Sequence, residues 1–153
     1  MNNNVTIQLE SPRGNGVSEL IRALDDYLSA LYPPESNHFL DLAQLAGPSV
    51  RFLVARRAGS AVACGALRID AEGYGEVKRM YVVPAARGQG LGRAILARIE
   101  EEARREGLRL LRLETGVRQA EAIALYRACG YVDCPPFGEY RPDPLSRFME
   151  KRL

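Results

Sequence analysis

Residues 80–96, MYVVPAARGQGLGRAIL, place three glycines within five positions, between an apolar run and an amphipathic run. The apolar run is typical of a strand, and the following run repeats Leu91, Ile95 and Ile99 at the four-residue spacing of a helix. The first turn of such a helix presents main-chain N–H groups that have no intrahelical partner. Because glycine has no side chain, an anion can approach these groups closely, and the helix dipole attracts it. The sequence therefore predicts a phosphate cradle, to which Arg87 adds a fixed positive charge.

Two common phosphate-binding loops do not fit these residues. A dinucleotide loop of the GxGxxG or GxGxxA type fails, because the required sixth position holds Arg93 or Ile95. A Walker loop needs a lysine followed by Ser or Thr, and the lysines of this chain stand at positions 78 and 151. The glycines therefore indicate a different phosphate ligand, and the simpler alternative is a tight turn without a ligand.

Hydrophobic periodicity predicts an α/β protein in which helices and strands are mixed along the chain. Ser18 is the expected N-cap of the first helix, and Gly107 and Gly130 end two later helices. The alternation of the fourth strand breaks near Met80, which indicates a bulge. We expect helices on both faces of one sheet, with strands over 5–10, 50–57, 61–69, 74–83, 108–115, 131–134 and 146–153, and helices over 17–31, 40–46, 89–106 and 119–130.

Composition limits the classes of protein that remain. A chain of 153 residues with 46% hydrophobic residues is expected to form one domain, over 1–153, with a real core. Its net charge of +2 gives no reason to expect nucleic acid or an anionic membrane as a partner. One histidine and three cysteines without a CxxC pair do not assemble a zinc site, so no metal is expected. The N-terminus does not resemble a signal peptide, and we expect a cytoplasmic protein.

Two segments together resemble the GNAT superfamily of N-acetyltransferases. VVPAARGQGLGRAIL is similar to the superfamily's acetyl-CoA loop, with Arg87, Gly90 and Gly92 at its defining positions. EAIALYRACGY, about 30 residues later, is similar to its late helix, with Tyr126 before a Cys-Gly-Tyr exit. The resemblance covers nearly the whole chain. It implies a mixed, mostly antiparallel sheet in which two central parallel strands, 74–83 and 108–115, splay apart in a V.

The resemblance also implies how acetyl-CoA, the expected cosubstrate, is bound. Its pantetheine arm would lie in the V along the first strand, and its pyrophosphate would lie on the glycine loop. Gln119 stands where many members have a cofactor-contacting asparagine, and glutamine can donate similar hydrogen bonds. The cofactor-binding residues implied are Tyr81, Val82, Val83, Arg87, Gly88, Gln89, Gly90, Leu91, Gly92, Arg93, Gln119, Ala122 and Tyr126.

Acetyl transfer to an amine requires a base for the amine, a donor for the thioester oxygen and an acid for the leaving thiolate. The resemblance implies Tyr126 as the general acid, and a phenol can deliver a proton to a thiolate at little cost. It implies Glu76 as the general base, either directly or through water, with a solvated strand carboxylate as the alternative. The oxyanion donor is expected to be a main-chain N–H near Val82.

The acceptor is expected to be the primary amine of a small polar molecule, acetylated directly in a ternary complex. The expected acceptor-binding residues are Tyr32, Glu35, Asn37, His38, Arg79 and Glu114. A protein or peptide acceptor is the nearest alternative. A non-catalytic acetyl-CoA-binding sensor or partner module and a general nucleotide binder are alternatives from other classes. A homodimer is common in the superfamily, and the last strand could take part in one.

Overall fold

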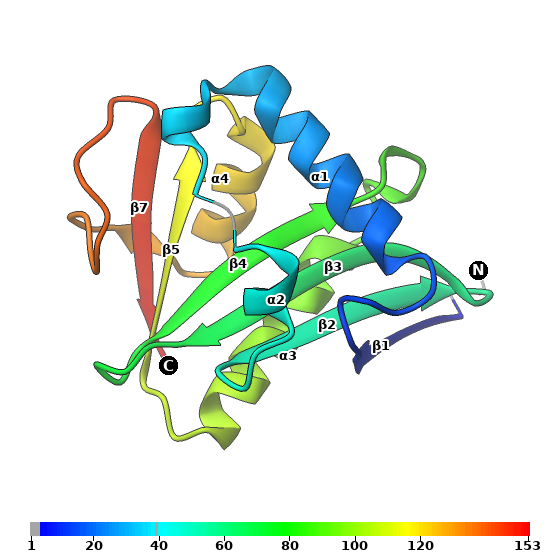
Figure 1. Cartoon of the computed structure of the whole chain (residues 1–153). Helices are drawn as coiled ribbons and strands as arrows, with labels where there is room; N and C mark the ends of the chain where they lie inside the picture. Colours follow the sequence, from blue (N-terminus) through cyan, green and yellow to red (C-terminus); the bar gives the residue numbers. More distant parts are fainter. Residues whose placement is uncertain (1–3, 39) are drawn as a thin grey trace.

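The computed structural model describes residues 4–38 and 40–153, and these form one seven-stranded sheet (Figure 1). The order across the sheet is β1-β2-β3-β4-β5-β7-β6, and every neighbouring pair is antiparallel except β4 and β5. This mixed, mostly antiparallel sheet confirms the expected fold class. The strands are β1 (Val5–Leu9), β2 (Val50–Arg57), β3 (Ser60–Ile69), β4 (Gly75–Val82), β5 (Leu110–Gly116), β6 (Val132–Asp133) and β7 (Ser146–Arg152).

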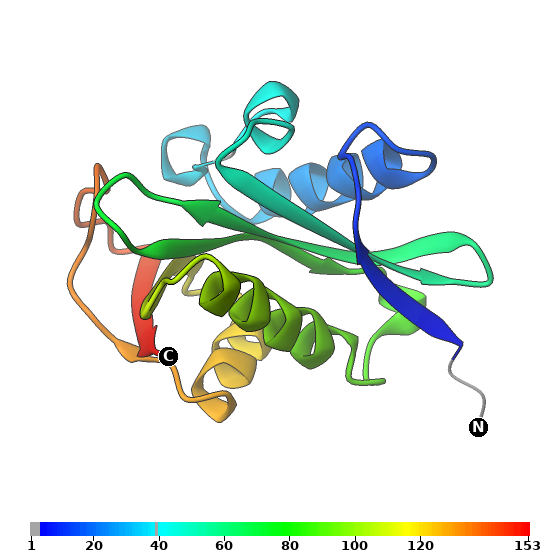
Figure 2. The same ribbon diagram turned by 90° about the horizontal axis from the view of Figure 1, so that it is seen from below.

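Helices cover both faces of the sheet, as Figure 2 shows from below. They are α1 (Val17–Leu31), α2 (Leu42–Leu45), α3 (Leu91–Arg105) and α4 (Ala120–Ala128), with short 3₁₀ turns at η1 (Pro34–Ser36) and η2 (Pro84–Ala86). In β2, Phe52 and Val54 pack in the core beneath α1, whereas Leu53 and Ala55 pack in the core beneath α3. This alternation is the period-two pattern of a strand that is buried on both faces. None of the described helices is long and apolar enough to cross a membrane.

The N-cap predicted for α1 is wrong by two residues. Gly16 occupies the cap position with a φ of 77°, and the Ser18 hydroxyl lies within the helix, where it donates to the Glu19 carboxylate at 3.3 Å. A left-handed residue is most easily supplied by glycine, and it turns the chain so that Val17 can start the helix fully buried. Core packing of Val17 therefore sets where α1 begins.

The two central strands separate after a short stretch of pairing, which confirms the predicted V. Among the described residues, β4 pairs with β5 only over Gly75–Val77 and Leu111–Leu113. Beyond Val77, β4 continues along β3, while β5 pairs with β7 over its whole length (Figure 1). The sheet therefore opens between the last residues of β4 and the end of β5.

A β-bulge lies in β4 at the predicted phase break. Cys64 pairs with Tyr81 and Ala66 pairs with Lys78, so Gly65 faces two residues, Arg79 and Met80. Arg79 adopts a φ of 60°, which is unusual for a residue other than glycine. A Cβ on Gly65 would lie 2.7 Å from the Met80 sulfur, so the glycine makes room for this side chain. The bulge changes the alternation of the β4 side chains at the wall of the V.

Candidate functional site

A large cleft of about 600 Å³ lies between the end of β4, the glycine loop and the start of α4. Met80, Tyr81 and Val82 of β4 form one side of it, and Gln119, Ala122 and Tyr126 of α4 form the other. The glycine loop and the first turn of α3 close one end through Gly88, Gly90, Leu91, Gly92 and Arg93. The cleft is therefore long, and it has main chain at one end and side chains on both flanks.

The glycine loop has the geometry of an anion cradle. Gly88 and Gly90 adopt φ values of 77° and 81°, and a Cβ on either would meet nothing within 4 Å. Gly90 is the N-cap of α3 and supplies no side-chain hydrogen bond, so the first-turn N–H groups are left to the cleft. Gly92 has a different role, since a Cβ there would lie 3.1 Å from Leu125 of α4. The loop therefore combines access for a ligand with close helix packing.

Arg87 lies at the same end of the cleft. Its Nε donates to the Val82 carbonyl at 2.9 Å, and its guanidinium carbon lies 5.6 Å from the centre of the Tyr81 ring. The Tyr27 ring of α1 lies on it as well, at 5.9 Å. The guanidinium thus stands between the strand end and the cradle, where it adds positive charge to the cleft.

A smaller cavity of about 80 Å³ lies on the side of the V that faces α1 and the loop after it. Its wall is largely polar and includes Asn37, His38, Lys78, Arg79 and Glu114. It shares Leu24, Met80, Gln119 and Tyr126 with the cleft. The two spaces therefore meet at Tyr126, inside the V.

Comparison with known proteins decides the family. The model of the Acetyltransferase (GNAT) family matches residues 17–131. The chain belongs to the GNAT family of acetyltransferases. It is 63% identical over 151 residues to the IAA acetyltransferase of Azospirillum brasilense, which covers 98% of this chain and 99% of that protein.

Solved structures agree with the GNAT assignment. An acyl-CoA N-acyltransferase from Klebsiella pneumoniae superposes with a TM-score of 0.87 at 44% identity, over 99% of each chain. PaiA N-acetyltransferase from Thermoplasma acidophilum, in complex with coenzyme A, has a TM-score of 0.72 at 16% identity, over 98% of this chain and 99% of that one. The second likeness shows the fold alone. The GNAT chain described here is thus an acetyltransferase by family and by fold.

Most of the expected cofactor residues of this GNAT chain line the large cleft, and two do not. The N–H of Val83 donates to the Val62 carbonyl at 2.9 Å, which extends the sheet. The Gln89 side chain accepts a hydrogen bond from Arg57 on the protein surface. The expected cofactor residues that do line the large cleft are Tyr81, Val82, Arg87, Gly88, Gly90, Leu91, Gly92, Arg93, Gln119, Ala122 and Tyr126.

Sequence reasoning missed Tyr27 and Arg118 as lining residues of the cleft. Tyr27 belongs to the helical stripe of α1, and nothing in that stripe separates a core residue from one at the cleft. Arg118 directly precedes Gln119 at the start of a predicted helix, and this position could have indicated that Arg118 lines the cleft. Among the described residues, no group of three or more His, Cys, Asp or Glu side chains is arranged to hold a metal.

Tyr126 is buried on α4 and lines both the cleft and the smaller cavity. Burial raises the pKa of its phenol well above the ordinary value, and the negative charge of Glu114 raises it further. The phenol therefore stays protonated at neutral and mildly alkaline pH. Such a group keeps its proton and can donate a hydrogen bond to an atom that reaches it from the cleft.

Glu114 of β5 lies in the wall of the smaller cavity, as expected for an acceptor-binding residue. One of its oxygens accepts a hydrogen bond from the Ser146 hydroxyl at 2.8 Å. Burial raises the pKa of this carboxyl, against the hydrogen bond from Ser146 and the charges of His38 and Lys78, which lower it. A carboxylate with a raised pKa beside a cavity is suited to accept a proton.

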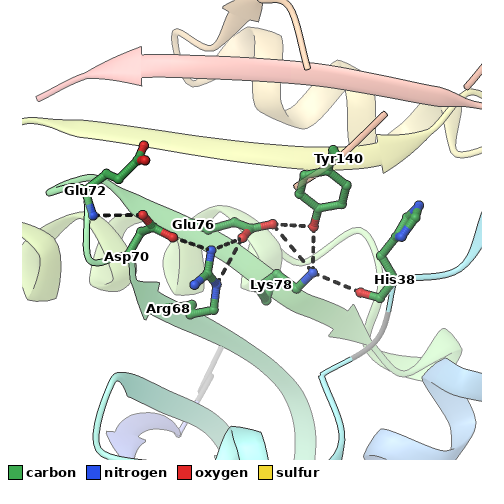
Figure 3. A network of polar contacts seen from close by, with 7 residues as sticks. All are labelled: His38, Arg68, Asp70, Glu72, Glu76, Lys78 and Tyr140. Carbon is green, nitrogen blue, oxygen red and sulfur yellow. Dashed lines mark hydrogen bonds and ion pairs between the residues drawn. The ribbon is translucent and has the colours of Figure 1, made fainter. Parts of the chain in front are cut away.

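Glu76 of β4 lies beside the V but lines neither the cleft nor the smaller cavity. Figure 3 shows that its carboxylate is held inside a polar network. One oxygen accepts from Arg68 Nε and Nη2 at 3.1 and 2.9 Å. The other accepts from the Tyr140 hydroxyl at 2.5 Å and lies 3.5 Å from Lys78 Nζ. Its side chain is 2% exposed, and the carboxylate borders neither space directly.

Of the other residues expected to bind the acceptor, most line the smaller cavity and one does not. Asn37, His38 and Arg79 line the smaller cavity, whereas Glu35 is exposed and lines neither space. Tyr32 lines it too, but its hydroxyl is already engaged by the turn between β5 and α4.

Tyr32 connects the end of α1 to that turn. Its hydroxyl accepts from the Arg118 N–H at 3.0 Å and donates to Gln119 Oε1 at 3.3 Å. The same Gln119 oxygen accepts from the Gly116 N–H at 3.1 Å. A Cβ on Gly116 would lie only 1.8 Å from the Tyr32 hydroxyl oxygen, so the glycine is needed for this contact. Tyr32 is therefore a wall residue that closes the cavity.

Proposed function

We propose that this GNAT enzyme transfers an acetyl group from acetyl-CoA to the primary amine of a small polar molecule, directly in a ternary complex. The observation that supports this most is the meeting of two unlike spaces at Tyr126. The larger one has an anion cradle and a strand edge, and the smaller one has a largely polar wall. A donor and an acceptor bound in them would face each other across one phenol.

The large cleft fits acetyl-CoA. The N–H groups of the first turn of α3, with Gly88 and Gly90, would hold the pyrophosphate. The stretch of β4 that no longer pairs with β5 offers main-chain groups to the amides of the pantetheine arm. A main-chain N–H near Val82 stays our predicted donor to the thioester oxygen.

We propose Tyr126 as the general acid and Glu114 as the general base. Glu114 would take one proton from the acceptor ammonium before the amine attacks the thioester carbon. As the C–S bond breaks, Tyr126 would give its proton to the thiolate and take the second proton of the acetylated nitrogen in its place. The position of Glu114 in the cavity wall supports this assignment. Glu76, which the sequence favoured, would then act as a structural carboxylate in the network around Lys78.

The size of the acceptor cavity supports a small molecule over a peptide. The cavity volume of about 80 Å³ is well above the ~10–15 Å³ that a single water needs, so it has room for a small molecule. The lining includes side chains from α1, the following loop, β4 and β5.

Calorimetry and a thiol-release assay test the proposal. We expect purified protein to bind acetyl-CoA, and to release coenzyme A in the presence of some of a panel of small amines. IAA is tested separately beside the amines, because the relative from Azospirillum brasilense carries it in its name. Cofactor binding without release in any amine would support the sensor alternative. No heat from acetyl-CoA or coenzyme A at millimolar concentration would refute the proposal.

A further inference from the structure

The bulge in β4 turns two consecutive basic side chains to the same face of the sheet. In a regular strand, neighbouring side chains point to opposite faces. Here Lys78 Nζ reaches the His38 carbonyl at 2.9 Å, and Arg79 Nη2 reaches Asp25 of α1 at 2.6 Å. Both side chains therefore extend toward α1 and the loop after it, and both residues line the smaller cavity.

The wall of this cavity has more positive than negative charge. Lys78 and Arg79 are its cationic side chains, and Glu114 is the one carboxylate among its described lining residues. The carboxylates that pair with the two cations, Glu76 and Asp25, stand outside the cavity. An acceptor that enters it therefore meets a carboxylate on β5 and two cations on β4.

Lys78 is poorly solvated where it stands. Its side chain is 10% exposed, and its nearest carboxylate oxygen, on Glu76, is 3.5 Å away. That carboxylate is shared with Arg68, while the shorter contacts of Nζ are to uncharged oxygens of His38 and Tyr140 (Figure 3). Burial accordingly lowers the pKa of Lys78. A second anion in the cavity would stabilise this ammonium, because opposite charges attract strongly where water is excluded.

We propose that the acceptor is a small zwitterion, an amine that also carries a carboxylate. Its ammonium lies toward Glu114 and Tyr126, and its carboxylate lies toward Lys78 and Arg79. This inference rests on the proposed acetyl transfer to an amine and names the acceptor class of the same site. An ω-amino acid of three or four carbons has a size that suits the cavity volume of about 80 Å³.

Two matched sets of amines test the inference. The first is β-alanine, propylamine and 1,3-diaminopropane, and the second is 4-aminobutyrate, butylamine and 1,4-diaminobutane. Within each set the distal group changes from anionic to neutral to cationic on a similar skeleton. We expect kcat/KM in the thiol-release assay to be at least about tenfold higher for the amino acid in one or both sets, since each tenfold step is about 1.4 kcal/mol of interaction. Calorimetry on the coenzyme A complex should detect binding of the amino acid and not of propylamine.

Lys78→Gln is the decisive variant, and Lys151→Gln is its matched control. Lys151 pairs with Glu100 at 3.0 Å and lines neither space. We expect the preference for the amino acid over the neutral amine to fall at least about fivefold in Lys78→Gln, by an increase in KM, and to persist in Lys151→Gln. Lys78→Arg should retain part of it. If Lys78→Gln does not fold, Arg79→Gln provides the same comparison.

The outcomes separate this inference from the proposed function. Acetyl transfer with an equal or greater preference for the neutral or cationic amines would overturn the zwitterion and leave N-acetylation intact. Binding of acetyl-CoA with neither turnover nor calorimetric binding of either amino acid would also overturn it. Failure to bind acetyl-CoA would instead refute the proposed function itself.

Discussion

Replacing Glu76 with glutamine separates a structural carboxylate from a catalytic one. The two side chains have nearly the same shape, so the substitution removes a charge and little volume. The native carboxylate accepts two hydrogen bonds from Arg68, at 3.1 and 2.9 Å, and one from Tyr140 at 2.5 Å. A glutamine amide can accept at one end only, so one side of this network loses its acceptor.

The expected loss of stability follows from the burial of these partners. Breaking a buried ion pair costs about 3–5 kcal/mol. The Arg68 side chain is 28% exposed and keeps Asp70 at 3.0 Å, which lowers the cost. We therefore expect Glu76→Gln to lose about 2–3 kcal/mol of unfolding free energy. For a chain of 153 residues, this lowers the Tm by about 4–12 °C.

In contrast to Glu76→Gln, Glu114→Gln is expected to lower the catalytic rate and not the stability. A general base contributes about 10²–10⁴-fold to the rate, so kcat should fall by at least about a hundredfold. Because burial raises its folded-state pKa, the stabilising contribution of Glu114 is full below the ordinary glutamate pKa and is lost as the pH rises through the raised value. At pH 8 the ionised carboxylate is therefore a cost, and glutamine should leave the unfolding free energy equal or slightly higher.

Urea denaturation and the pH profile of kcat/KM measure both effects. Wild-type activity should rise with pH through the raised pKa of Glu114, where the base becomes ionised. We expect this acidic limb to persist in Glu76→Gln, and the kcat of the folded variant to stay within about threefold of wild type. In Glu114→Gln we expect the acidic limb to disappear. The assignment is refuted if Glu76→Gln loses the limb while Glu114→Gln keeps both limb and rate.

Two further predictions concern the site, and a third concerns the partly buried thiol of Cys134. Tyr126→Phe should lower kcat at least about tenfold with acetyl-CoA affinity within about twofold, and an unchanged kcat would remove its role as acid. Gly116→Ala should displace the Tyr32 hydroxyl, raise the acceptor KM and cost about 1–3 kcal/mol in stability, and a melting curve equal to that of wild type would contradict the contact. Burial raises the pKa of Cys134 to about 11, so only about a thousandth of it is thiolate at pH 8, and iodoacetamide should label it far more slowly than free cysteine.

The local chemistry of the cradle could be predicted from sequence because it depends on neighbouring residues. A glycine before a helix start defines the N–H groups at that start, whatever the rest of the chain does. The same holds for the phase break near Met80, which the structure confirms as a bulge. Family resemblance then supplied the splayed strands, which periodicity alone does not show.

The roles of the acidic residues could not be predicted in this way. Glu76 and Glu114 both stand on strands at the V, and their neighbours in the sequence do not distinguish their roles. Only the fold shows that Arg68 and Tyr140 engage the first, while the second borders a cavity.

The sequence by itself determined the order of elements, the GNAT family and the glycine loop before α3, because these depend on periodicity and on residues close together in the chain. The tertiary structure alone decided which titratable groups meet. Lys78 and Arg79 belong to one strand, but whether they face the same cavity depends on Gly65 of the neighbouring strand and on the bulge opposite it. Distances between side chains and the water excluded around them arise only when strands, helices and loops pack, and they set the charge and the proton affinity on which this site depends.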